Sequence, residues 1–171
     1  MELQTHPCPY DQQRYFADMK LSEEIMSSLL QADVIILPLG RNDAPFAFTS
    51  GAAYLYQYLH NKNVRVEIAC DDDNYEEIEL NSKVLRLGKI LLKSTVLPLT
   101  IGIIGNYIYD AIKDEEKKEP IVEFVSPTEL NVEIIIVDSL GTRESLSIEY
   151  NGEAKDFPEV AKEIEKLWNE H

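Results

Sequence analysis

One apolar stretch, Leu85 to Ile112, constrains this chain more than any other feature. From Ile90 to Tyr109 its only formally charged residue is Lys93. A surface helix carries charged side chains on the face that meets water, so most of this stretch must be buried. We expect it to be helical and bent near Pro98, whose missing N–H interrupts the helical hydrogen bonds.

Either protein or lipid could bury this stretch. It is long enough for a membrane-spanning helix, which needs about 20 apolar residues. Thr95, Thr100 and Asn106 weaken that interpretation, because lipid cannot satisfy polar side chains, and Pro98 weakens it because it interrupts a helix. We favour burial by protein, in the core or against partner subunits, with one transmembrane helix as the alternative. The side chains expected to make contacts are Leu92, Val96, Leu99, Ile103, Ile104 and Tyr107.

A strand–helix–strand unit precedes the apolar stretch. The continuous apolar run Val34–Leu37 is typical of a strand covered on both faces. Ser50 is expected to cap a helix over residues 51–60, and Val64–Ala69 is expected to form the second strand. A single helix between two strands predicts that they lie side by side and parallel.

The N-terminal part of the chain lacks a regular apolar pattern, whereas the C-terminal part has a clear one. Pro7 and Pro9 predict an irregular first 20 residues, after which Ser22 is expected to cap a short helix. The C-terminal part predicts a strand at 121–125, a hairpin of strands 131–138 and 144–150, and a helix from Phe157 to Trp168 that Asp156 caps.

These elements predict an α/β or α+β protein. We expect an α/β unit over residues 1–112, a charged linker over 113–120 and a ββα unit over 121–171. The two units either stay separate or pack as one domain. Both arrangements are consistent with 171 residues.

Composition excludes one class of partner. Aspartate and glutamate number 31 against 16 lysines and arginines, which gives a net charge of −15. This charge repels phosphate backbones, so we expect no direct binding of nucleic acid. Cys8 and Cys70 are far apart in sequence and indicate two reduced thiols. The start of the chain lacks a signal-peptide pattern, so we expect a cytoplasmic protein.

Motifs for chemistry are weak. The sequence contains no nucleophile elbow and no metal-ligand spacing, so we expect neither catalysis nor a metal or other cofactor. The strongest alternative is an anion site where a helix follows a loop, since helix N-termini attract anions. Its residues would be Arg41, Thr49, Ser50 and Gly51.

Two resemblances accompany these patterns. The unit over residues 33–70, with Asp71, Asp72 and Asp73 after its second strand, resembles the opening of TIR-like and flavodoxin-like domains. The run VLPLTIGIIGNYIYDAIK, residues 96–113, resembles small accessory proteins of bacterial multigene operons, some of them associated with defence against phage. The second resemblance implies a multisubunit context and no active-site residue.

The sequence therefore favours a non-catalytic interaction subunit that docks through residues 85–112 on protein partners or on further copies of itself. One alternative is a module that senses a small anionic, nucleotide-like ligand at the helix start near Ser50. Another is a membrane-associated effector with one transmembrane helix.

Overall fold

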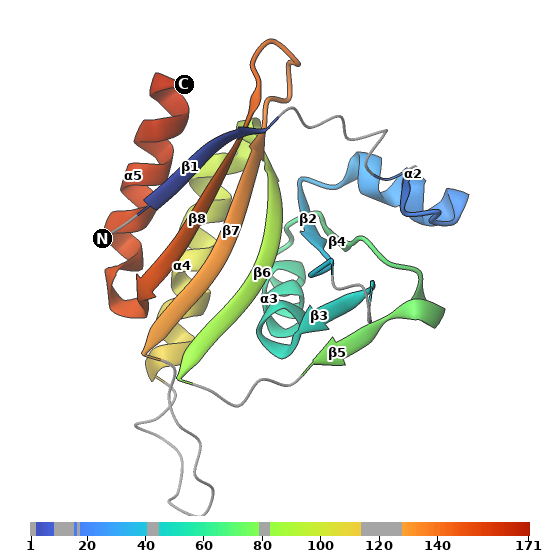
Figure 1. Cartoon of the computed structure of the whole chain (residues 1–171), viewed down its shortest axis with the longest axis horizontal. Coiled ribbons are helices and arrows are strands. Elements are labelled where there is room, and N and C mark those ends of the chain that lie inside the picture. Colours follow the sequence, from blue (N-terminus) through green and yellow to red (C-terminus); the bar gives the residue numbers. More distant parts are fainter. Residues whose placement is uncertain (1–2, 9–15, 17, 41–44, 79–82, 114–127) are drawn as a thin grey trace, which may run out of the picture.

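A computed structural model describes residues 3–8, 16, 18–40, 45–78, 83–113 and 128–171. Within these ranges the chain forms a mixed α/β structure, with a six-stranded sheet between layers of helices (Figure 1). The α/β prediction is confirmed. The predicted linker at 113–120 and the predicted strand at 121–125 fall almost entirely outside the described residues.

The sheet has the order β1-β8-β7-β6-β2-β4, and a separate parallel pair joins β3 to β5. Strands β2 and β4 are parallel neighbours, with Val34 beside Val66, which confirms the predicted βαβ unit. Strand β2 lies antiparallel to β6 on its other side. The strands are β1 (Leu3–Cys8), β2 (Val34–Leu37), β3 (Ala47–Thr49), β4 (Val66–Ile68), β5 (Glu76–Ile78), β6 (Val84–Lys93), β7 (Glu129–Val137) and β8 (Ser145–Glu153).

The predicted helix from Leu85 is wrong over its first third, because residues 84–93 form the strand β6. Leu87 and Ile90 are buried against one helical layer, while Leu91 is buried on the opposite face. A strand covered on both faces shows the same continuous apolarity as a buried helix. Gly88, with φ +69°, sits at an irregularity in the pairing with β7.

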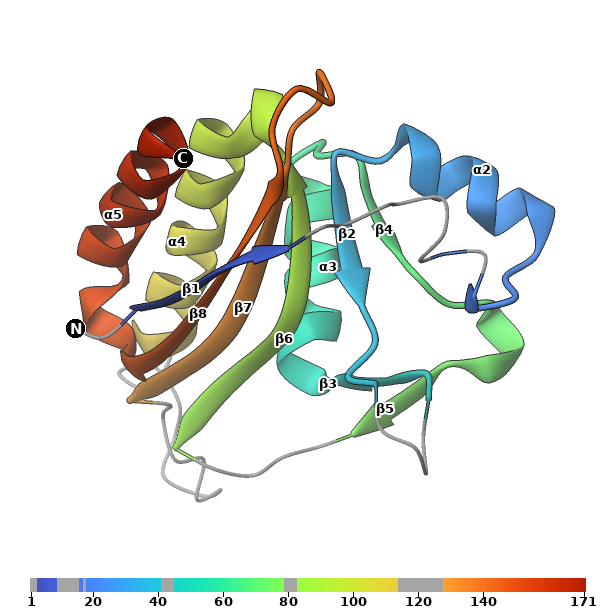
Figure 2. The same ribbon diagram turned by 45° about the horizontal axis from the view of Figure 1, so that its top comes forward.

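Helices α3, α4 and α5 cover one face of the sheet (Figure 2). Their inward side chains share a single apolar core with β2, β6, β7 and β8. The predicted helix ends agree well for α3 and α5, although the cap of α3 is Thr49 and Asp156 makes no side-chain capping bond. The helices are α2 (Glu23–Gln31), α3 (Ser50–Asn61), α4 (Leu97–Lys113) and α5 (Phe157–Glu170).

Helix α2 covers the opposite face of the sheet over β2 and β4. Leu29 of α2 and Phe16 pack there on Ile35 and Ile135. Ser22 caps α2 by accepting a hydrogen bond from the N–H of Ile25 at 3.3 Å, as predicted.

The C-terminal hairpin joins the sheet of the N-terminal unit. Strands β7 and β8 pair antiparallel, which confirms the predicted hairpin, and β7 also pairs parallel with β6. Residues Leu3–Cys8, predicted to be irregular, form the edge strand β1 against β8. Pro7 is compatible with that strand because prolines are tolerated at a sheet edge.

Candidate functional site

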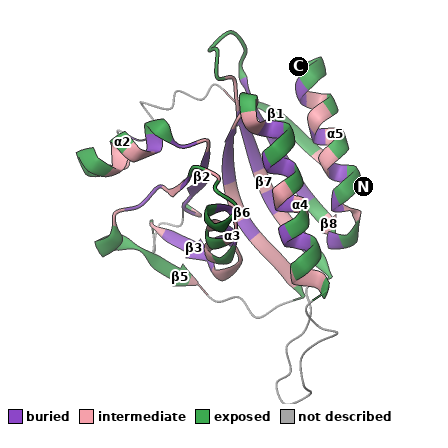
Figure 3. Cartoon of the chain, turned by 180° about the vertical axis from the view of Figure 1, so that it is seen from behind, coloured by how far each residue is buried: buried purple, intermediate pink, exposed green. Residues whose placement is uncertain are grey.

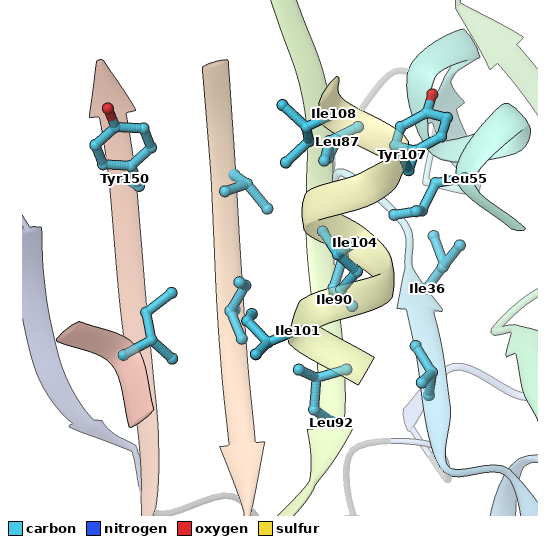
Figure 4. Close-up of a cluster of buried hydrophobic side chains, with 14 of the residues drawn as sticks. Ile36, Leu55, Leu87, Ile90, Leu92, Ile101, Ile104, Tyr107, Ile108 and Tyr150 are labelled. Carbon is cyan, nitrogen blue, oxygen red and sulfur yellow. The ribbon is translucent and has the colours of Figure 1, made fainter. Parts of the chain in front are cut away.

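Helix α4 is apolar on two sides. Ile101, Ile104 and Ile108 point into the core toward the sheet, as Figure 4 shows. On the side that faces away from the sheet, Leu99 is 68% exposed and Tyr109 is 58% exposed. Figure 3 shows the alternation of buried and exposed turns along this helix. The outer side therefore exposes large apolar side chains that the fold itself does not use.

The exposed side follows the helical repeat. Leu99, Gly102, Asn106 and Tyr109 are all exposed and are spaced by three, four and three residues. Residues at this spacing lie above one another on one face of a helix. We call these four residues the outer stripe. A Cβ added at Gly102 would meet no atom within 4 Å, so the stripe is open at that point.

Two charged side chains, Asp110 and Lys113, lie close to the C-terminal end of the outer stripe. The Tyr58 hydroxyl of α3 donates to Oδ2 of Asp110 at 3.3 Å, which directs that carboxylate toward α3. The pKa of Tyr58 is raised, first by burial and then by the Asp110 carboxylate. Lys113 Nζ lies 5.1 Å from the centre of the Tyr109 ring and donates to its hydroxyl at 3.1 Å. Tyr54 of α3, 64% exposed, adds a further aromatic surface on the helical layer.

The predicted interface residues separate into two groups. Leu92, Ile104 and Tyr107 are buried in the chain's own core, so they hold the fold together. Leu99 is exposed, and Val96 and Ile103 are partly buried. Gly102, Asn106 and Tyr109 were missed by the sequence reasoning. A helical repeat continued from Leu99 places all three on the same side as Leu99.

The residues of the predicted anion site lie at the start of α3, against β6. Thr49 is buried, and its Oγ1 accepts from the N–H of Ala52 at 3.1 Å and donates to the Arg86 carbonyl at 2.5 Å. A Cβ on Gly51 would come 2.7 Å from the same carbonyl oxygen. Ser50, the first residue of α3, is partly buried beside them, and Arg41 lies outside the described residues. Thr49 and Gly51 thus join α3 tightly to β6.

Another polar cluster lies on the sheet face opposite α4. Ser147 Oγ donates to Oε1 of Glu133 at 2.8 Å, and Lys89 Nζ lies 3.7 Å from Oε2 of the same residue. The pKa of Cys8 is raised, first by burial and then by Glu133. A raised pKa keeps this thiol protonated and a poor nucleophile at neutral pH. The Ser147 hydroxyl is buried and directed at Glu133, so the cluster satisfies its own polar groups.

The β7–β8 turn is held by a single carboxylate. Asp138 Oδ2 accepts hydrogen bonds from the N–H of Thr142 at 2.7 Å and from the N–H of Arg143 at 3.0 Å. Hydrogen bonds from Thr142, first its hydroxyl, lower the pKa of Asp138 to about 2. The Arg143 side chain contacts α5. Its guanidinium lies 5.1 Å from the Trp168 ring centre and donates a hydrogen bond to the Trp168 carbonyl. Leu140 at the tip is 81% exposed.

Comparison with known proteins finds no matching family model, curated relative or solved structure. The site is therefore interpreted from its own geometry. Among the described residues, Ser94–Lys113 is the one helical segment whose length and composition would suit a membrane span, and core helices of soluble proteins meet the same criteria. In none of the described ranges do three or more His, Cys, Asp or Glu side chains gather so that they could hold a metal ion.

Proposed function

We propose that this chain is a non-catalytic protein-interaction subunit that docks through the outer stripe of α4. One observation carries the proposal: α4 has no charged residue from Leu97 to Tyr109, although this segment has a side that faces solvent. The chain carries a net charge of −15, so charged residues are abundant elsewhere. An exposed helix face without charge is typical of a surface that another protein covers.

Docking on protein accounts for the site better than insertion into lipid does. Moving α4 into a bilayer would withdraw Ile101, Ile104 and Ile108 from the core they share with the sheet. Each fully buried side chain of this size stabilises the fold by about 1.5–3 kcal/mol. The net charge of −15 would also be repelled by anionic membrane surfaces.

A pull-down from a lysate of the source organism tests the proposal. The tagged wild-type chain is compared with Leu99→Asp, which places a charge in the outer stripe. Leu140→Asp is the matched control, because Leu140 is also highly exposed but lies at the β7–β8 turn. We expect bound proteins to be lost with Leu99→Asp and retained with Leu140→Asp. Recovery of the same proteins with all three chains would contradict the proposal, as would flotation of the wild type with neutral lipid vesicles.

A further inference from the structure

Strand β8 contains the one Asn–Gly pair of the sequence, Asn151–Gly152, just before the strand ends at Glu153. The backbone nitrogen that follows an asparagine can attack the asparagine side chain, and a glycine hinders this attack least because it has no side chain of its own. We propose that Asn151 is a site of spontaneous deamidation, which the pairing of β8 with β7 suppresses in the folded chain. This proposal is independent of docking through α4.

The reaction needs water as its only co-reactant. The Gly152 nitrogen forms a bond to Cγ of Asn151 and loses its proton. The bond from Cγ to Nδ2 breaks, and that nitrogen leaves as ammonia. Water then opens the resulting five-membered cyclic imide at either of its two carbonyl groups. One product is aspartate, and the other is isoaspartate, in which the backbone continues through the side-chain carbonyl.

Packing of the core explains why glycine follows Asn151. A Cβ at Gly152 would lie 2.5 Å from the Tyr150 hydroxyl oxygen, so any other residue would have to displace that group. Tyr150 is 1% exposed, and its hydroxyl donates to the Glu153 carbonyl at 2.8 Å. Figure 4 shows the Tyr150 ring near the end of β8. The core therefore fixes a glycine directly after the asparagine.

The Asn151 side chain is accessible to water and has a hydrogen-bond donor beside it. Asn151 is exposed and lines an open hollow of about 370 Å³ together with Arg86 and Asn131. Asn131 lies opposite Asn151 in the pairing of β7 with β8, and its Nδ2 donates a hydrogen bond to Oδ1 of Asn151. A donor at this oxygen stabilises the negative charge that develops there when the ring closes.

The strand pairing opposes ring closure. Asn151 lies opposite Asn131, Gly152 lies opposite Leu130, and the paired stretch ends at Glu153. Closure needs a rotation of the backbone at Asn151, which an extended and paired chain does not allow. The ends of paired elements open at a lower free energy than their middles. The rate of deamidation should therefore report how often this end of β8 opens.

The two products should differ in their effect on the fold. Aspartate leaves the backbone unchanged, and Asn131 can still donate to its carboxylate, so the strand can pair again. Isoaspartate lengthens the backbone by one carbon, which displaces Glu153 and disturbs the hydrogen bond that its carbonyl accepts from Tyr150. A chain that has formed isoaspartate should therefore keep this end of the sheet open.

Peptide mapping by mass spectrometry, after incubation at mildly alkaline pH, tests the site by following conversion of amide to acid. In the urea-unfolded chain, Asn151 should deamidate faster than Asn61 and Asn106, which are followed by Lys62 and Tyr107. In the folded chain, conversion of Asn151 should be at least about tenfold slower than in urea, because only opened molecules react. Equal rates in the two conditions would overturn the proposal. So would an unfolded chain in which Asn151 reacts no faster than the other two asparagines.

Two tyrosine variants test whether the strand end controls the protection. Tyr150→Phe removes the hydrogen bond to Glu153, so deamidation of the folded chain should rise about threefold or more. Tyr107→Phe is the matched control, because it removes a hydroxyl hydrogen bond to the Gly51 carbonyl on α3 and should leave the rate at Asn151 unchanged. In urea both variants should match the wild type. Equal acceleration by both variants, or no acceleration by Tyr150→Phe, would overturn control by the end of β8.

Discussion

Helices α4 and α5 lie beside one another on the same face of the sheet, yet their outer sides differ. Both bury an apolar row, which includes Ile104 in α4 and Ile164 in α5. Away from the sheet, α5 exposes Glu159, Lys162 and Lys166, whereas α4 exposes the outer stripe. Contact with the sheet therefore accounts for the apolar inner side of both helices, and contact with water accounts for the charged outer side of α5. Neither the sheet nor water accounts for the outer side of α4, and under our proposal a protein partner covers it.

The largest expected effect tests whether the inner sides are equivalent. Ile104→Asp and Ile164→Asp each place a carboxylate where the wild-type side chain is fully buried. Each should lower the free energy of unfolding by about 4 kcal/mol or more, because a buried unpaired charge is strongly unfavourable. Urea unfolding followed by circular dichroism measures this. A loss below about 1 kcal/mol at Ile104 alone would show that α4 is not part of the core.

Two tyrosines allow the buried and exposed sides of α4 to be compared with a smaller change, the loss of one hydroxyl group. The Tyr107 hydroxyl donates to the Gly51 carbonyl at 2.9 Å in a part-buried position, while Tyr109 is mostly exposed. Tyr107→Phe removes this hydrogen bond and should lower the free energy of unfolding by about 0.5–1.5 kcal/mol. Tyr109→Phe should change it by less than about 0.5 kcal/mol. Equal losses in urea unfolding would mean that the two sides are not distinct.

The β7–β8 turn contacts the short turn Ser94–Val96 through Asp138 and the end of α5 through Arg143, and its stability should respond to acid. The pKa of Asp138 falls from 3.8 to about 2 in the folded chain, mainly through hydrogen bonds from Thr142. Because the folded-state value is the lower one, ionised Asp138 stabilises the fold above about pH 4, and this contribution is lost as pH falls toward about 2.

Asp138→Asn should therefore lower Tm at neutral pH and make Tm less dependent on pH across that acidic range. Differential scanning calorimetry between about pH 2 and pH 7 measures both changes. Asp73→Asn, in the short turn after β4, controls for the loss of one negative charge. If both variants keep the wild-type slope of Tm against pH, the hydrogen bonds to Asp138 do not contribute to stability.

The smallest expected effect concerns the outer stripe itself. Leu99→Asp should change the free energy of unfolding of the dilute chain by less than about 0.5 kcal/mol. Leu99 is mostly exposed and lies in the first turn of α4, where a negative charge is favourable to the helix dipole. Urea unfolding at low chain concentration measures it. A loss comparable to that of Ile104→Asp would place Leu99 in the core.

The sequence predicted those elements whose pattern has a single interpretation. The Val34–Leu37 strand, α2 with its Ser22 cap, and the β7–β8 hairpin all have clear ends and a clear repeat. The apolar stretch from Leu85 was ambiguous, because a strand buried on both faces and a buried helix have the same composition. The edge strand β1 has no apolar alternation and forms through pairing with β8, which local sequence does not encode.

The candidate site could be predicted only in part for a related reason. The sequence indicated that the apolar stretch makes contacts, and Leu99 was among the residues named. It could not decide which of Leu99 and Ile104 is buried, because both sides of the helix lack charge and composition alone does not show which side faces the sheet. Packing in the folded chain decides this, since Ile104 lies in the core shared with the sheet and Leu99 faces away from it.

The most direct test of the central claim measures whether the outer side of α4 becomes covered. Single cysteines at Leu99→Cys and, as a control on α5, Lys162→Cys are introduced in a Cys8→Ser chain, in which Cys70 is buried. Their rates of reaction with a maleimide are compared between the isolated chain and the complex recovered by the pull-down. We expect the cysteine on α4 to react at the control rate in the isolated chain and at least about tenfold more slowly in the complex, since the protected fraction follows the binding equilibrium. Equal rates for both cysteines in the complex would contradict a covered outer stripe.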